Sequence, residues 1–74
     1  MRKWYNYGRA ENGKPNEFRI ILEEHGIPLI LYRAFWNPKR GTYRLYPHTV
    51  FIPGEYRFEP FTLRIWDVEI KKRP

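Results

Sequence analysis

Hydrophobic and polar residues alternate with short periods along most of this chain. The run "PLILYRAFW" at residues 28–36 is almost wholly apolar, which is typical of a strand buried on both faces, so we expect it in the middle of a sheet. Shorter runs rich in aromatic and β-branched residues are bounded by Pro, Gly or Asn. They predict further strands at 2–7, 42–46, 48–52, 55–59 and 61–71, with Pro53 and Gly54 in a type II turn between 48–52 and 55–59.

One segment, "NEFRIILEEHGIP" at residues 16–28, has a helical period instead. Its side chains at i, i+3, i+4 and i+7 would share one helical face: Phe18, Ile21, Leu22 and His25. Asn16 can cap the start, Gly26 fits the left-handed position after a helix, and Pro28 prevents continuation. These signals predict a helix over residues 17–25. The β-branched residues of "FRIIL" leave a strand as the competing interpretation.

The last predicted strand changes phase in its middle. Its apolar alternation runs through Phe61, Leu63 and Ile65 and then continues through Trp66, Val68 and Ile70. Because a slip of one residue turns all later side chains to the other face, we expect a β-bulge at Ile65–Trp66.

Together these elements predict a single α+β domain over residues 1–74. One strand and one short helix would precede a mostly antiparallel meander, giving a sheet of five to six strands with the helix on one face. If the helix is absent, the alternative is a small all-β barrel of the OB or SH3-like kind. A chain of 74 residues without cysteine has no disulfide to support its core, so its 19% aromatic content must fill it.

Charge changes the picture because it is unevenly placed. The net charge is +6, and residues 27–54 contain no acid at all. The cations of that stretch have no local partner: Arg33, Lys39, Arg40 and Arg44. This favours a polyanionic partner, first nucleic acid and then an acidic protein or membrane surface, unless acids from elsewhere fold over these residues.

The hairpin in "FWNPKRGTYRLYP" at residues 35–47 could bring these cations onto one face. With a four-residue loop Arg33 lies opposite Arg44, and with a five-residue loop Arg33 lies opposite Leu45. The sequence does not choose between the two registers. With the four-residue loop, one face of the hairpin would join the core and the other would combine cations and aromatic rings. The second face would hold Leu31, Arg33, Phe35, Thr42, Arg44 and Tyr46.

Cations that contact phosphates beside rings that stack on bases are typical of single-stranded nucleic acid binding. We therefore expect a small RNA- or DNA-binding module of low sequence specificity. Its predicted contact residues are Arg33, Lys39, Arg40, Arg44, Tyr46 and Trp36, with Arg2, Lys3 and the tail "KKRP" adding charge. The alternative is a protein-interaction or assembly component, such as a ribonucleoprotein subunit, a viral accessory protein or a homo-oligomer, whose aromatic surface is an interface.

Enzyme and metal chemistry have little support in the sequence. The chain has no Ser or Cys nucleophile and no phosphate-binding loop, and its two histidines have no acid at a metal-ligand spacing. We expect no cofactor and no metal; a metal-independent ribonuclease could use only His48 with Arg44 and Tyr46. No apolar stretch is long enough for a membrane span and the N-terminus does not resemble a signal peptide, so we expect a cytoplasmic protein without a membrane partner.

Overall fold

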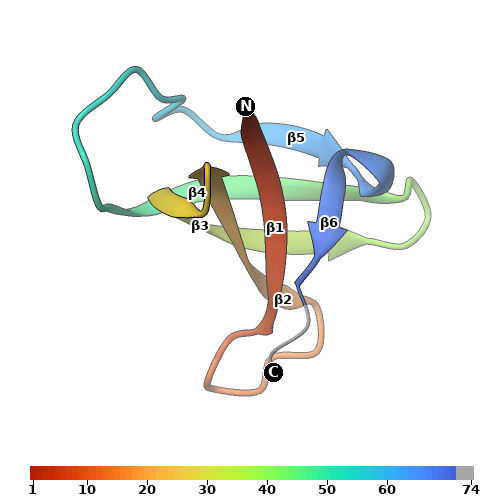
Figure 1. The fold of residues 1–74 in the computed structure, drawn as a ribbon. Coiled ribbons are helices and arrows are strands. Elements are labelled where there is room, and N and C mark those ends of the chain that lie inside the picture. The colour runs from red at the N-terminus through yellow and green to blue at the C-terminus, as the bar shows by residue number, and fades with distance from the viewer. Residues whose placement is uncertain (72–74) are drawn as a thin grey trace.

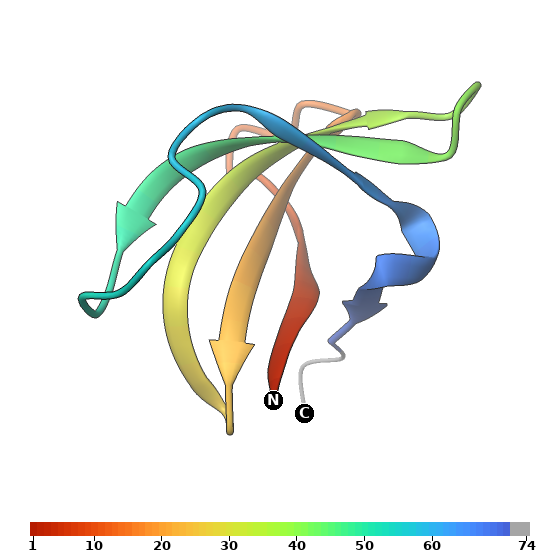
Figure 2. The same ribbon diagram turned by 90° about the horizontal axis from the view of Figure 1, so that it is seen from above.

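The computed structural model describes residues 1–71 and shows one six-stranded sheet curled into a half-barrel (Figure 1, Figure 2). The elements in chain order are β1 (Arg2–Arg9), β2 (Glu17–Glu24), β3 (Ile27–Asn37), β4 (Thr42–Val50), β5 (Phe61–Arg64), the 3₁₀ turn η1 (Ile65–Asp67) and β6 (Val68–Ile70). In space the strands lie in the order β5-β4-β3-β2-β1-β6. All neighbouring pairs are antiparallel except β1 and β6, which run parallel.

The helix predicted over residues 17–25 is wrong, because this segment is β2 and pairs with β1 on one side and β3 on the other. Its buried Ile20 and Leu22 lie two residues apart, so burial follows the period of a strand. No α-helix covers either face of the sheet within the described residues. The α+β fold is therefore wrong. The all-β alternative is nearer, although the sheet is a curled half-barrel instead of a closed barrel.

The turn after β2 explains why the helix signals misled. Glu24 pairs with Ile27, so His25 and Gly26 form a complete two-residue hairpin loop. Both have positive φ, 52° and 78°, as the type I′ turn of a tight hairpin requires. A glycine with positive φ also ends many helices, so Gly26 fits both interpretations. Histidine is among the few non-glycine residues enriched in this conformation.

The β3–β4 hairpin has a register that differs from both predicted ones. Asn37 pairs with Thr42, so the loop is Pro38–Gly41, and Arg33 lies opposite Tyr46. The loop forms one helical turn in which the Gly41 N–H donates to the Asn37 carbonyl at 2.9 Å. The Asn37 side chain also accepts the Lys39 N–H at 3.1 Å, which fixes the turn. The tip of this hairpin extends away from the rest of the sheet (Figure 2).

The hairpin predicted from strands 48–52 and 55–59 is not present. β4 continues to Val50, with His48 as an extra residue in a bulge, and the chain from 51 to 60 has no regular structure. This loop is held by side chains: the hydroxyl of Tyr32 donates to the Arg57 carbonyl at 3.1 Å, and that of Tyr56 donates to the Ile52 carbonyl. The Tyr56 ring occupies the space that a Cβ at Gly54 would need, so Gly54 allows this ring to fold back.

The last segment is broken at the position where the sequence changes phase. A 3₁₀ turn at Ile65–Asp67 stands where a bulge was expected. Before it, β5 pairs with β4 at one edge of the sheet; after it, β6 pairs with β1 at the other edge. The turn therefore carries the chain across the open side of the half-barrel (Figure 2).

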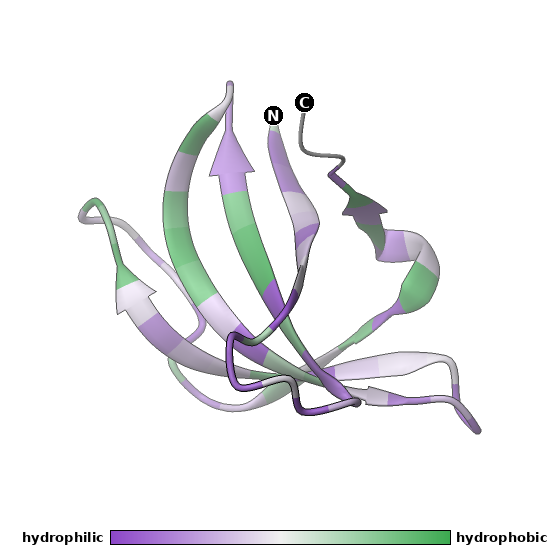
Figure 3. Ribbon diagram, turned by 90° about the horizontal axis from the view of Figure 1, so that it is seen from below, coloured by the Kyte–Doolittle hydropathy of each residue, from purple (hydrophilic) through white to green (hydrophobic). Residues whose placement is uncertain are grey.

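The core lies on the inner, concave face of the sheet. Alternate residues of every strand contribute to it, and hydrophobic and hydrophilic bands accordingly alternate along the strands (Figure 3). Three aromatic rings at its centre touch one another: the ring centroids of Trp4, Tyr32 and Phe61 are 5.3–5.6 Å apart. Around them are the buried aliphatic residues Ile20, Leu22, Leu29, Ile30, Ala34, Leu45 and Val68.

Candidate nucleic-acid interface

The outer face of the sheet is the side turned away from the core, and it carries the predicted cations Arg33 and Arg44. The strand registers place two rows of side chains across it. One row runs Arg19, Arg33 and Tyr46 on β2, β3 and β4, and the next runs Glu17, Phe35, Arg44 and Thr62 from β2 to β5. Arginines and aromatic rings are therefore neighbours in both rows.

Arg33 does lie opposite another arginine, but that arginine is on β2, whereas the predicted partner, Arg44, is on β4. Its partner across β2 is Arg19, while Arg44 lies across from Phe35. Two facing arginines repel each other unless an acid or a bound anion offsets their charge. Here Glu17 offsets one of them, because the Arg33 Nε donates to its Oε1 at 2.9 Å.

The acids of this face are already bound by cations. Glu17 is only 2% exposed, and the hydrogen bond from Arg33 holds the pKa of its carboxyl below the usual value. Burial alone would raise the pKa of Glu23, but hydrogen bonds from Tyr7 and Lys71 outweigh it and lower that pKa. The charges of Lys14 and Arg19 also lower the pKa of Glu17, whose Oε2 is buried without a hydrogen-bond partner in the described part of the chain.

Three arginines on or beside the outer face have no carboxylate partner among residues 1–71: Arg9, Arg19 and Arg44. Arg44 donates only to the Thr62 hydroxyl, at 3.3 Å. Arg19 has an Nη1 that is buried and meets no hydrogen-bond acceptor. Such a group is costly to leave unpaired, so Arg19 favours an incoming acceptor.

The aromatic part of the face is the pair Phe35 and Tyr46. Their ring centroids are 5.6 Å apart in an edge-to-face arrangement, and the Arg33 guanidinium lies 5.6 Å from the Phe35 centroid. Tyr46 is 40% exposed. A base could therefore stack at Tyr46 while arginines lie within reach of its phosphates.

The structure brings together some predicted site residues and separates others. Arg33, Arg44 and Tyr46 share the outer face, and Lys39 and Arg40 are exposed at the hairpin tip. Trp36 points to the inner face, where its ring centroid lies 4.8 Å from that of Tyr43. Trp36 therefore packs against the core and does not lie on the proposed stacking surface.

The two predicted residues of β1 lie away from this centre. Arg2 faces the inner side, where it pairs with Glu24 and its guanidinium lies 5.7 Å from the Tyr56 ring centroid. Lys3 is on the outer side but pairs with Glu69 near the β6 edge. Of the tail, residues 72–74 lie outside the described part of the chain. Lys71 is held between Tyr5 and Tyr7, 4.7 and 5.3 Å from their ring centroids.

The predicted contact residues did not include Arg9, Arg19 or Phe35. Arg19 was hidden by the helix interpretation, because only as a strand does "EFRIILEE" place Glu17, Arg19 and Ile21 on one face. The alternation in the segment was the signal that could have found it. Phe35 was placed on the correct face, but its role beside Tyr46 depends on a register that the sequence left open.

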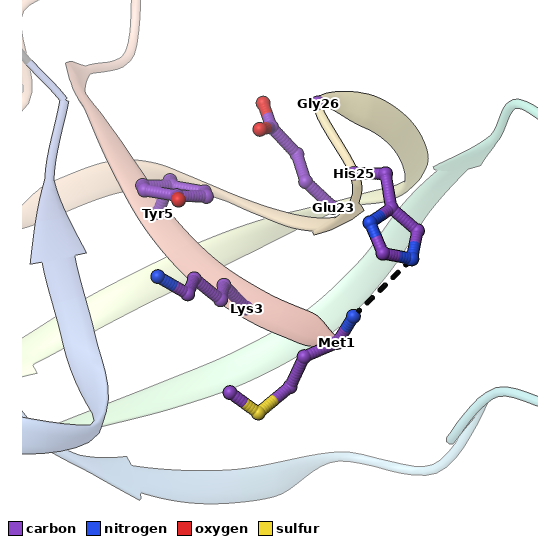
Figure 4. Close-up of a pocket in the computed structure, with 6 residues that line it drawn as sticks. All are labelled: Met1, Lys3, Tyr5, Glu23, His25 and Gly26. Carbon is purple, nitrogen blue, oxygen red and sulfur yellow. Dashed lines mark hydrogen bonds between the residues drawn. The ribbon is translucent and has the colours of Figure 1, made fainter.

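A second surface with polar groups lies at the open end of β1 beside the His25–Gly26 turn (Figure 4). It is lined by Met1, Lys3, Tyr5, Glu23, His25 and Gly26. Its polar groups bond to one another or to neighbours: the terminal amine lies 3.4 Å from the His25 Nε2, as the dashed line shows, and the Glu23 carboxylate accepts from Lys71. No donor or acceptor there calls for a ligand.

Catalytic and metal chemistry gain no support from the side-chain arrangement. His48 is exposed, and its Nδ1 lies 2.7 Å from the Thr49 hydroxyl. Within residues 1–71 no three potential ligands among His, Asp and Glu gather closely enough to hold a metal ion. The described part of the chain also contains no helix of the length and apolarity needed to span a membrane.

Comparison with known proteins yields no relative: no protein-family model, no curated protein and no solved structure matches the chain.

Proposed function

We propose that this protein binds single-stranded nucleic acid on the outer face of its sheet. The observation that carries the proposal is a set of arginines that form no salt bridge within residues 1–71, together with the exposed ring of Tyr46; these are Arg9, Arg19 and Arg44. Guanidinium groups attract and hydrogen-bond phosphate, and an exposed ring stacks on any base. Such a surface binds with little sequence preference.

The shape of the face favours a single strand over a duplex. Bases of a single strand are free to splay onto rings such as Tyr46, whereas those of a duplex are stacked on one another. The outer face also lacks a helix among the described elements that could enter a major groove. Phosphate contacts would provide most of the affinity, so binding falls as salt rises.

The test is fluorescence anisotropy with labelled single-stranded RNA and DNA of about 15 nucleotides at rising salt, starting from about 50 mM. The double variant Arg19→Gln/Arg44→Gln removes two proposed phosphate contacts. Its plot of log affinity against log salt should be shallower by about 1.4, since each contact to a single strand contributes about 0.7.

A control variant removes a cation that lies outside the outer face. Arg57 belongs to the 51–60 loop, has no carboxylate partner within the described residues, and its guanidinium lies 5.3 Å from the Phe61 centroid. Arg57→Gln should leave the salt dependence unchanged. A loss in the control half as large as that in the double variant, and so equal per removed charge, would mean that net charge alone drives binding. No binding at about 50 mM salt would refute the proposal.

A second candidate, protein interaction, is favoured by exposed apolar residues away from the outer face. Phe51, Phe58 and Trp66 are 48%, 59% and 71% exposed, which is unusual for side chains of this size in a small domain. Light scattering across the same salt series separates the two candidates. A dimer that is insensitive to salt and ignores oligonucleotides favours interaction, and a monomer that binds them favours the first proposal.

A further inference from the structure

A pocket of about 370 Å³ opens on the outer face between β1 and β4. It is lined by Tyr7, Arg9, Glu11, Arg19, Ile21, Leu31 and His48. Four strands contribute to it, so the sheet itself fixes the positions of most of its side chains. Its volume is within the range of small-molecule sites, roughly 300–1,000 Å³.

Unsatisfied donors line this pocket. The buried Nη1 of Arg19 has no acceptor, and Arg9 is exposed with no carboxylate partner in the described chain. His48 uses its Nδ1 on the Thr49 hydroxyl, which leaves Nε2 turned to other partners. Two guanidinium groups and an imidazole lining one concave site are the chemistry that binds a phosphate group.

The rest of the lining is suited to a flat ring. Ile21 and Leu31 are direct cross-strand partners and form an apolar surface, and Tyr7 adds an aromatic wall. Glu11 belongs to the same lining and would repel a bare phosphate, but it can accept hydrogen bonds from the amino groups of a base or the hydroxyls of a sugar. The pocket therefore combines features for a phosphate with features for the organic part of a nucleotide.

We propose that this pocket holds one nucleotide of the bound strand, with its phosphate on Arg9 and Arg19 and its base over Ile21 and Leu31. The proposal rests on the function proposed above and adds a defined subsite to it. Arg19 is the cross-strand partner of Arg33, so the pocket is continuous with the row that ends at Tyr46. A strand that crosses this row can place one base in the pocket and stack another on Tyr46.

The pocket on the inner face fits a nucleotide less well. The pocket on the inner face, lined in part by Trp4, Tyr32, Tyr56 and Phe61, is larger, at about 500 Å³. The hydroxyls of Tyr32 and Tyr56 there already donate to backbone carbonyls of the 51–60 loop. Its side chains thus hold the loop in place, whereas the Nη1 of Arg19 is still without an acceptor.

The experiment is an NMR titration of the full chain with adenosine monophosphate, adenosine and inorganic phosphate as separate probes. We expect the monophosphate to bind more tightly than either of its parts and to shift amide signals of β1 and β2 around Tyr7 and Arg19. Arg19→Gln and Arg9→Gln should each weaken it at least tenfold. Arg57→Gln, which removes the same charge on the 51–60 loop away from the outer face, should leave its affinity within about twofold.

Several outcomes would overturn the subsite. These are shifts confined to the inner face, equal binding of inorganic phosphate and the monophosphate, or equal losses in Arg19→Gln and Arg57→Gln. If oligonucleotides bind the wild-type chain while the pocket variants bind the monophosphate as tightly as Arg57→Gln does, the subsite fails and the outer-face function stands. If the monophosphate binds in the pocket but oligonucleotides do not bind, the strand-binding function fails and the pocket is a mononucleotide site. If Arg19→Gln does not fold, Arg9→Gln still tests the subsite, because it changes an exposed side chain.

Discussion

The two faces of the sheet are stabilised in different ways. The inner face is filled by side-chain volume, with Ile20, Ile30 and Leu45 fully buried around the aromatic centre. The outer face is held by charge, because Glu17 and Glu23 are almost fully buried acids that bind Arg33 and Lys71. The arginines beside these pairs are not needed to neutralise them. Stability and the proposed binding therefore depend on different residues of the same strands.

The largest expected effect is the loss of inner-face volume. Ile30→Ala removes a fully buried side chain, and such changes cost about 2–5 kcal/mol of unfolding free energy. Its neighbour Leu31 is half-buried on the outer face, and Leu31→Ala should cost about 1 kcal/mol. Urea unfolding followed by tryptophan fluorescence measures both. Equal costs would show that the outer face also depends on packing and would remove the contrast between the faces.

Acid should weaken the outer face selectively. The pKa of the Glu17 and Glu23 carboxyls is lower in the folded protein than the ordinary 4.5. Their contribution to stability is therefore fully present above about pH 4.5 and is lost as the pH falls through the lower folded values. Unfolding free energies measured from pH 7 to pH 3 should decline over that range.

Glu17→Gln sharpens this test. At pH 7 it leaves Arg33 without its anion and should destabilise the protein. The difference should shrink towards pH 3, because protonation progressively removes the Glu17 charge from the wild type and the variant has none. The same stability difference at both pH values would mean that the carboxylate charge is not what holds this face.

The turn between β2 and β3 determines which side chains of these strands lie on each face. A substitution in this turn, with a smaller expected effect, tests its conformation. Gly26 has φ 78°, a conformation that costs residues with a Cβ about 1–2 kcal/mol. Gly26→Ala should lower the unfolding free energy by about that amount, whereas His25→Asn should be neutral or stabilising, because Asn-Gly is the preferred type I′ pair. A neutral Gly26→Ala would contradict the left-handed conformation of the turn.

The faces of β3 and β4 could be predicted from the sequence because alternation is a local property. Both the predicted four-residue register and the observed one put Arg33, Phe35, Arg44 and Tyr46 on one face, since they differ by an even number of residues. The register itself depends on the helical turn closed by the Asn37 side chain, which no pattern of apolar residues encodes.

The pairing of strands that are distant in the chain could not be predicted from the sequence, for a different reason. The parallel pairing of β6 with β1 joins residues more than sixty positions apart, and only the 3₁₀ turn at Ile65–Asp67 allows it. The apolar phase change marked the break but not its direction. For β2, the period of Phe18, Ile21 and Leu22 and the capping residues agreed on a helix, and pairing with two neighbouring strands overrode them.

The variant with the smallest expected effect on stability also separates most clearly the residues that stabilise the sheet from those that bind nucleic acid. Arg44 is exposed and bonds only to the Thr62 hydroxyl, so Arg44→Gln should change the unfolding free energy by less than about 0.5 kcal/mol while weakening oligonucleotide binding. Arg33→Gln removes the same charge but leaves the buried Glu17 without its partner, and should destabilise the protein clearly more. If both variants lost equal stability, Arg44 would be part of the charge network that holds the sheet. If Arg44→Gln kept full oligonucleotide affinity and an unchanged salt dependence, Arg44 would not contact phosphate, and the binding surface would have to lie nearer Arg19 and Arg9.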